Sequence, residues 1–325
     1  MQPLVTHPQA AVADAIPAGV ASPDGRIYYV ATPRGIEALD AATGAVAWST
    51  AAAGVPVIAL ADTLLAIRGA APFDGSWLGA GTPVAIDVAA PHATRTGAPF
   101  ELPLARHRLD GARIAGGALV AAWRASTEDG GGPVREPLPD VEGSIHLDLA
   151  TGAARITEGA ALPESVRQVL ASAGQWTMPW RTRDGWSALV IGGLPGAQSM
   201  TLSHWPDAGA SHTTLLLDGL DLRTTRVLHV NARHAFVRTC DLQAPERCEL
   251  RVHDAETGAP AATFADPLPA QISPPFALIG RDLLAVEHAT TRGAPGRALV
   301  AFAPGAPAPR WRHPIAPEPF VPPRP

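Results

Sequence analysis

The chain has 325 residues, a formal net charge of −5 and 46% hydrophobic residues. This length is within reach of one large all-β domain, and this hydrophobic content is ordinary for a globular protein. The negative charge provides no basic field that would attract nucleic acid, and no apolar run has the length of a membrane span. We therefore expect no nucleic-acid partner and no transmembrane segment.

All 25 basic residues are arginine. Without lysine, the chain cannot use a Schiff-base lysine, a lysine general base or the phosphate-binding lysine of a P-loop. The 34 Pro and 31 Gly predict many turns. Asn231 is the only asparagine, which limits the amide ligands available to a metal.

The best-defined stretch of the sequence, Asp24–Thr50, predicts three short strands separated by two tight turns. The strands are Arg26–Thr32, Ile36–Leu39 and Ala45–Trp48. Glu37 faces away from its strand neighbours. In the second turn, Asp40 can bond the following backbone amides and Gly44 can take a positive φ.

This turn recurs along the chain, which is the signature of a repeat architecture. The copies are Leu39–Gly44, Ile86–Pro91, Leu147–Gly152, Ser203–Gly209, His253–Gly258 and Phe302–Gly305. They start about 47 to 61 residues apart, slightly more than the ~40–50 residues of a four-stranded propeller blade. The sequence therefore predicts an all-β fold, a β-propeller of four-stranded antiparallel blades, with six blades favoured and seven or eight as alternatives.

A pair of β-type segments precedes each turn: Ile16–Thr32, Val55–Arg68, Ala112–Trp123, Trp176–Ile191, Arg226–Arg238 and Pro274–Glu287. The only convincing helix, Pro163–Ala173, lies in a connection and does not alternate with strands, which argues against a βαβ fold. We expect an N-terminal lead-in over residues 1–15, a propeller over 16–313 and a Pro-rich C-terminal tail over 314–325.

The two cysteines, Cys240 and Cys248, flank a short loop between two strand-like segments. A disulfide that closes this hairpin is preferred over two free thiols, and it would imply an oxidising compartment. Residues 1–20 show no signal-peptide pattern. We expect an extracytoplasmic protein, periplasmic or secreted, whose signal is absent from this chain; a cytoplasmic location remains open.

The residues Gly25–Val30, Gly35–Gly44 and Val46–Trp48 resemble the PQQ-like β-propeller repeat. This repeat occurs in quinoprotein dehydrogenases and in the outer-membrane assembly lipoprotein of the BamB type. The match covers about 30 residues, and Asp148–Gly152 and Asp254–Gly258 extend it. The blades of this family usually number seven or eight.

The resemblance implies structural roles for the repeated residues: Asp40, Gly44, Trp48, Asp148, Gly152, Asp254, Gly258 and Trp311. The aspartates would cap turns, and Trp48 would pack between adjacent blades. Quinoprotein dehydrogenases bind PQQ with a longer chain, adjacent cysteines and a calcium site that uses Asn. This chain lacks those features, so we expect no PQQ and no other cofactor.

Sequence motifs for catalysis are missing. No G-x-S-x-G, H-E-x-x-H or C-x-x-C pattern is present. His229 and His234 are closest to a metal-binding pair, but a strand–turn–strand with exposed or satisfied histidines is the favoured interpretation. His204 and His212 are similarly weak candidates, and Arg181, Arg183 and Asp184 are expected in a solvated hairpin. We therefore assign no catalytic and no metal-binding residue.

Propeller loops divide between two faces, and the short Asp-x-x-Thr-Gly turns belong to one of them. The long segments belong to the other, which we term the loop-rich face: Gly69–Pro83, Ala125–Gly143, Cys240–Cys248, Ala289–Arg297 and the connections Thr94–Arg106 and Thr157–Gly174. Rigid scaffolds usually display function on loops. The candidate partner-binding residues are Phe73, Trp77, Glu128, Asp129 and Arg135.

Phe73 and Trp77 are candidates because aromatic side chains are enriched at binding hot spots. Packing of both rings over their own blade is an equal alternative. The sequence thus favours a non-enzymatic propeller scaffold that binds a protein or peptide partner through the loop-rich face. The alternative is a metal-dependent hydrolase or lyase with a site at the mouth of the central channel.

Overall fold

The computed structural model describes residues 15–315 apart from internal segments. The residues outside this description are 1–14, 53, 69–79, 102–107, 116–117, 126–140, 149–150, 152, 159–163, 165, 167, 169–174, 177–178, 183, 195–196, 222, 242, 245–246, 266–271, 289–295, 307 and 316–325.

The described strands form six antiparallel sheets, each built from consecutive strands. Sheet 1 contains β1 (Ala15–Ile16), β2 (Gly19–Ala21), β3 (Ile27–Thr32), β4 (Gly35–Asp40) and β5 (Val46–Thr50). Sheet 2 contains β6 (Val55–Ala59), β7 (Thr63–Arg68), β8 (Ala80–Asp87), β9 (Thr94–Thr96) and β10 (Phe100–Glu101). Sheet 3 contains β11 (Arg108–Ala115), β12 (Ala118–Ala125), β13 (Val141–Asp148) and β14 (Ala154–Glu158).

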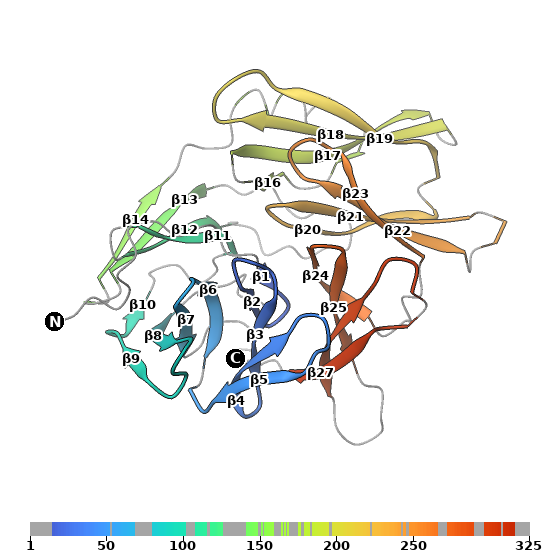
Figure 1. Ribbon diagram of the computed structural model, residues 1–325. Coiled ribbons are helices and arrows are strands. Elements are labelled where there is room, and N and C mark those ends of the chain that lie inside the picture. The colour runs from blue at the N-terminus through green and yellow to red at the C-terminus, as the bar shows by residue number, and fades with distance from the viewer. Residues whose placement is uncertain are drawn as a thin grey trace, which may run out of the picture.

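Sheet 4 contains β15 (Gln175–Trp176), β16 (Trp180–Arg181), β17 (Gly185–Leu194), β18 (Ala197–Pro206) and β19 (His212–Leu220). Sheet 5 contains β20 (Thr225–Val230), β21 (His234–Cys240), β22 (Cys248–Asp254) and β23 (Pro260–Ala265). Sheet 6 contains β24 (Ile272–Ile279), β25 (Asp282–His288), β26 (Arg297–Phe302) and β27 (Trp311–Ile315). In Figure 1 the first strands of five sheets, β1, β6, β11, β20 and β24, gather near the middle of the view.

The predicted all-β fold is confirmed. Within the predicted helix, Glu164, Val166 and Gln168 are helical, and the Gln168 side chain donates to Glu164 one turn earlier at 3.2 Å. Thr94–Thr96 was expected in a connection and instead forms β9 at the edge of β8. Three residues are too few for a strand pattern to be visible in the sequence. In the described part of the chain, no helix has the length and apolarity to cross a membrane.

Hydrophobic clusters join neighbouring sheets. Sheets 1 and 2 share one cluster, sheets 4 and 5 another, and sheets 5 and 6 a third. A further cluster joins sheet 6 to sheet 1, where Leu284 and Val286 of β25 pack with Tyr28 and Val30 of β3. The first strands of sheets 2 and 3, β6 and β11, also lie against each other. Because a lone sheet leaves both of its faces in water, these contacts stabilise each sheet through its neighbours.

The Asp-x-x-Thr-Gly turn of sheet 5 lies against the strands of sheet 4. Three successive carbonyls of this turn accept hydrogen bonds from sheet 4: Ala255 O from Ser187 Oγ, Glu256 O from His212 Nε2 and Thr257 O from Thr214 Oγ1. A Cβ on Gly258 would lie 2.8 Å from the Cβ of Thr214. The glycine therefore allows the outer strand of sheet 4 to approach the turn closely.

The turn of sheet 1 meets the outer strand of sheet 6 in the same way. Trp311 Nε1 donates to Ala41 O at 3.0 Å, and Arg310 donates to Ala42 O at 3.4 Å. A Cβ on Gly44 would lie 2.6 Å from Trp311 Cδ2. Gly44 also has a φ of +69°, in the left-handed region. The turn of sheet 1 therefore packs on the outer strand of sheet 6 as the turn of sheet 5 packs on the outer strand of sheet 4.

Glu37 is buried where sheet 1 meets sheet 6. Its Oε2 lies 2.6 Å from His313 Nε2, and its Oε1 lies 2.7 Å from Arg34 NH2. The side chain is on the face opposite Ile36 and Ala38, as strand alternation predicts. Both carboxylate oxygens have a partner, which offsets the cost of moving the charge out of water.

Candidate functional site

The predicted partner-binding residues lie outside the described part of the chain: Phe73, Trp77, Glu128, Asp129 and Arg135. Their role therefore stays a prediction. The β21–β22 loop belongs to the same predicted face, and the structure describes its two cysteines and four of the residues between them. This loop and the neighbouring β19–β20 turn form the candidate site.

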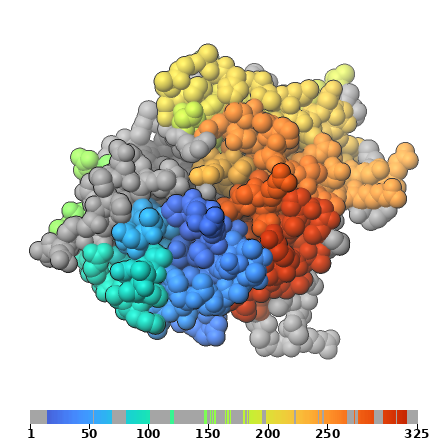
Figure 2. All heavy atoms as spheres, viewed as in Figure 1, coloured from blue at the N-terminus to red at the C-terminus, as the bar shows by residue number. Residues whose placement is uncertain are grey.

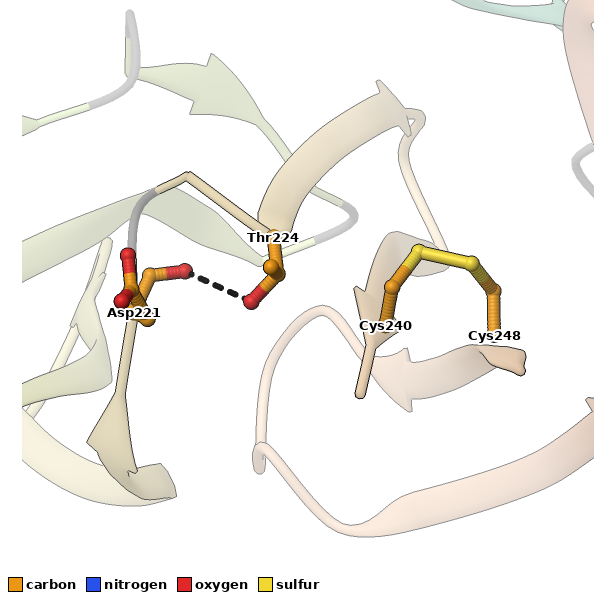
Figure 3. The surroundings of a disulfide bond; sticks show 4 residues. All are labelled: Asp221, Thr224, Cys240 and Cys248. Carbon is orange, nitrogen blue, oxygen red and sulfur yellow. Dashed lines mark hydrogen bonds between the residues drawn. A yellow bond between two sulfur atoms is a disulfide. The ribbon is translucent and has the colours of Figure 1, made fainter. Parts of the chain in front are cut away.

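A disulfide joins Cys240, at the end of β21, to Cys248, at the start of β22 (Figure 3). The two residues are direct cross-strand partners, with Cα atoms 3.9 Å apart. The Cys240 N–H donates to Thr224 O at 2.9 Å, away from β22. The two cysteines therefore form a non-hydrogen-bonded pair of the antiparallel ladder, the type of pair in which opposite side chains lie closest together. The structure thus contains the predicted disulfide.

The loop that the disulfide closes is also held by its own hydrogen bonds. Asp241 N donates to Arg247 O at 2.9 Å, and Arg247 N donates to Ala244 O at 2.7 Å. Gln243 N donates to the Asp241 carboxylate at 2.8 Å. Asp241, Gln243 and Arg247 are exposed, and Figure 2 shows the orange residues of this region projecting from one side of the molecule. A segment closed by a disulfide and internal hydrogen bonds loses less entropy on binding a partner than an unconstrained one does.

The β19–β20 turn lies beside the disulfide (Figure 3). Thr224 Oγ1 donates to the backbone carbonyl of Asp221 at 3.2 Å. The Arg223 guanidinium donates from Nε at 3.0 Å and from NH2 at 2.6 Å to the Asp221 carboxylate. These side-chain bonds, together with the Arg223 backbone N–H, lower the pKa of Asp221 to about 2. Arg223 is therefore fixed in orientation while 79% of its side chain stays exposed.

The aspartates that the sequence assigns to turn caps accept local hydrogen bonds in the structure. Asp40 Oδ1 accepts from the backbone N–H of Thr43 at 2.9 Å and from its hydroxyl at 2.8 Å. Asp254 accepts the same pair from Thr257, both at 2.8 Å. Asp148 accepts from the backbone of the equivalent threonine at 2.8 Å. The hydrogen bonds from Thr43 also lower the pKa of Asp40.

The two repeated tryptophans pack at sheet junctions. The Trp48 ring lies 5.6 Å from the Tyr29 ring and packs on the core between sheets 1 and 2. The Trp311 ring lies 6.1 Å from the Tyr28 ring in the core between sheets 6 and 1. Gly152, the remaining member of the predicted set, is outside the described residues.

One set of Ser, His and Asp side chains gathers in sheet 4, at its junction with sheet 5. His204 Nδ1 lies 2.9 Å from Ser187 Oγ. His204 Nε2 lies 3.1 Å from an Asp184 carboxylate oxygen, but it is not aligned for a hydrogen bond. Because these three residue types form the triads of serine hydrolases, the direction of each hydrogen bond matters.

Those directions do not fit a nucleophilic serine. Ser187 Oγ donates its only proton to Ala255 O, so it accepts from His204, and His204 Nδ1 carries the proton. A catalytic histidine instead removes the proton of the serine. Ser187 is also fully buried, so a substrate has no access to it. The set therefore links sheet 4 to the turn of sheet 5.

Asn231 and the nearby histidines also make structural contacts. Asn231 Oδ1 accepts from the backbone N–H groups of Arg233 and His234 at 3.0 and 2.9 Å. Its Nδ2 donates to Phe276 O of sheet 6 at 3.2 Å. The His229 ring lies 6.2 Å from the Phe276 ring. Among the residues that the structure describes, no three His, Cys, Asp or Glu side chains are placed to hold a metal.

Sequence reasoning missed the hydrogen-bonded set in sheet 4. It considered His204 and His212 only as weak metal-site candidates and did not connect them with Ser187 or with Asp184, although the two rings lie 5.2 Å apart and Asp184 lies 3.1 Å from His204 Nε2. Ser187 and His204 are direct cross-strand partners. Correct pairing of β17 with β18 would have placed them side by side, but the sequence alone does not give that register.

Known proteins offer little guidance. No protein-family model matches the chain, and no curated protein matches it in sequence. A quinohemoprotein alcohol dehydrogenase from Pseudomonas putida HK5 aligns over 87% of this chain and 62% of its own, with 11% identity and a TM-score of 0.28. PorZ, a surface component of the type-IX secretion system of Porphyromonas gingivalis, aligns over 87% of this chain and 46% of its own, with 13% identity and a TM-score of 0.19. The chain spans less than two thirds of either protein, and likenesses at these TM-scores assign neither fold nor function.

Proposed function

We propose that the chain is a six-bladed β-propeller that acts as a non-enzymatic scaffold and binds a protein or peptide partner through its loop-rich face. The blades are sheets 1 to 6, from Ala15 in β1 to Ile315 in β27, close to the bounds expected from the sequence: a propeller over 16–313, a lead-in over 1–15 and a tail over 314–325. Support for the circular order comes from the contact of sheet 6 with sheet 1, which repeats the contact of sheet 4 with sheet 5.

The observation that carries the binding role is the closed β21–β22 loop. Its disulfide and hydrogen bonds constrain the exposed residues Asp241, Gln243 and Arg247 at the end of sheet 5. Binding residues concentrate on loops that a rigid scaffold positions. Disulfides persist in oxidising compartments, which supports an extracytoplasmic location, periplasmic or secreted.

Affinity capture from an extract of the source organism tests this function. The variant Gln243→Arg places a long charged side chain on the exposed loop without removing a side-chain hydrogen bond described for this residue. The control, Ala42→Arg, adds the same group to an exposed position in the turn of sheet 1. We expect the native protein and the control to retain a common partner that the Gln243 variant loses.

Equal capture by all three proteins would contradict binding through this loop. Metal analysis of the purified protein separates the scaffold from the alternative enzyme. A stoichiometric divalent ion, with activity that depends on it, would favour the metal-dependent hydrolase or lyase.

A further inference from the structure

Buried side-chain atoms without a hydrogen-bond partner, within the described part of the chain, gather at the junction of sheets 4 and 5. Besides His204 Nε2, which has the Asp184 carboxylate beside it, they are Trp180 Nε1, Thr225 Oγ1, Thr239 Oγ1 and His253 Nε2. Trp180, Thr225 and His253 are 2%, 4% and 5% exposed. Buried polar atoms in folded proteins almost always bond another protein atom or an ordered water. These atoms therefore point to a partner that is not part of the chain.

Trp180 and His253 belong to the two faces that pack together. Trp180, in β16 of sheet 4, lies in the same hydrophobic cluster as Ala235 of sheet 5. His253 is the direct cross-strand partner of Ala235, so its side chain leaves sheet 5 on the same face, towards sheet 4. At the junction of sheets 6 and 1, by contrast, the Trp311 indole donates to Ala41 O. The Trp180 indole thus lacks the protein acceptor that Trp311 has.

The two threonines lie on the same face of sheet 5. Thr225 in β20 and Thr239 in β21 are direct cross-strand partners. Two residues away on these strands, Val227 and Val237 pack in the cluster that sheet 5 shares with sheet 4, and strand residues two apart share a face. The two hydroxyl groups therefore lie at the same junction as Trp180, at the end where Thr239 precedes Cys240.

The hydrogen-bonding roles of these atoms define the chemistry of their partner. The Trp180 indole N–H can only donate. His253 Nδ1 lies 3.2 Å from Gly258 O, so Nδ1 carries the proton and Nε2 can only accept. Burial lowers the pKa of His253, which keeps the imidazole neutral. An indole N–H repels a cation and an imidazole lone pair repels an anion, so a partner that suits both atoms is a neutral molecule that donates and accepts.

We propose that ordered water molecules bind inside the junction of sheets 4 and 5, where they accept from Trp180 Nε1, donate to His253 Nε2 and bond the two threonine hydroxyls. Ser187 and His212 of sheet 4 bond carbonyls of the sheet 5 turn directly. Because the sheets are in contact, water, the smallest molecule that both donates and accepts, is the ligand that suits the junction. Buried waters typically make about three hydrogen bonds to such groups. This site is independent of the scaffold function.

A crystal structure of the full chain, at a resolution that shows ordered water, tests this site. We expect a water oxygen within about 3.2 Å of Trp180 Nε1 and of His253 Nε2. The variant Trp180→Phe should lose the water at the indole position. The matched control Trp48→Phe, at the junction of sheets 1 and 2, should retain it.

Three crystallographic results would overturn the inference: a dry junction, a protein acceptor that bonds Trp180 Nε1 directly, or density for an ion or a larger solute in place of water. If Trp180→Phe does not fold, NMR of the native protein decides. The indole proton of Trp180 should then show a nuclear Overhauser contact with water, and the absence of that contact would overturn the inference as well.

Discussion

Gly44→Ala probes the contact between the first and last sheets. Gly44 has a φ of +69°, and an added Cβ would lie 2.6 to 3.0 Å from three atoms of Trp311. A left-handed conformation costs an L-residue about 1–2 kcal/mol, and forcing an extra carbon into a packed contact costs about 1–3 kcal/mol. Together these give a loss of about 2–5 kcal/mol, measured as the free energy of unfolding in urea by tryptophan fluorescence.

Gly305→Ala is the matched control for this substitution. Gly305 has a φ of +71° but no heavy atom within 4 Å of an added Cβ, so only the backbone cost of about 1–2 kcal/mol applies. In a Trp311→Ala background, the excess loss of Gly44→Ala over Gly305→Ala should shrink, because the ring atoms at 2.6 and 2.7 Å are gone and only the Cβ of residue 311, at 3.0 Å, remains. Equal losses for Gly44→Ala and Gly305→Ala in the native background would refute the packing of Trp311 on this turn.

Three further predictions concern the other contacts. Alkylation of the intact protein should label neither cysteine before reduction and both cysteines after it; labelling without reduction would disprove the disulfide. The double variant Cys240→Ser with Cys248→Ser should lower the free energy of unfolding by about 2.5 kcal/mol, the value expected for a loop closed over 8 residues. Ser187→Ala should lower the free energy of unfolding by about 2–4 kcal/mol, because it leaves Ala255 O and His204 Nδ1 without a hydrogen-bond partner. The control Ser203→Ala breaks only a hydrogen bond within sheet 4 and should lower it less. The reverse order of melting temperatures would contradict the connection between sheets 4 and 5 through Ser187. The Asp221 carboxyl should titrate with a pKa of about 2 by carboxyl NMR, and in Arg223→Gln this pKa should return towards its ordinary value near 3.8. Because the pKa in the folded state is depressed, the ion pair stabilises the fold above pH ~4, and its contribution is lost as the pH falls towards 2. An unchanged titration of Asp221 in the variant would disprove the pairing.

The local elements of the fold were predictable because their signals lie close together in the sequence. The spacing of Asp40, Thr43 and Gly44 contains the complete turn: a carboxylate acceptor, its two donors and a residue that tolerates positive φ. The disulfide was predictable for the same reason, since Cys240 and Cys248 end and begin adjacent strands. The all-β class followed from the repetition of such units.

The contacts between sheets were not predictable in the same way. Ser187 bonds Ala255 across 68 positions, and His313 bonds Glu37 across 276. Neither pair has a local pattern, because each depends on which sheet packs on which and in what register. The turn that contains Thr224 likewise comes to lie beside Cys240 only when β20 and β21 are paired. The candidate site therefore combines a predictable loop with a turn that only the pairing of the strands brings beside it.

The junction of sheet 6 with sheet 1 has a consequence for the order of folding. Each sheet is one continuous stretch of chain and forms from local contacts, whereas the bond from Trp311 to Ala41 spans 270 positions. Closing so long a segment carries the largest chain-entropy cost, and contacts of long sequence separation form slowly. The contact between the two ends of the chain should thus assemble after the individual sheets. In native-state hydrogen exchange, the amides at this junction should open before those inside any single sheet.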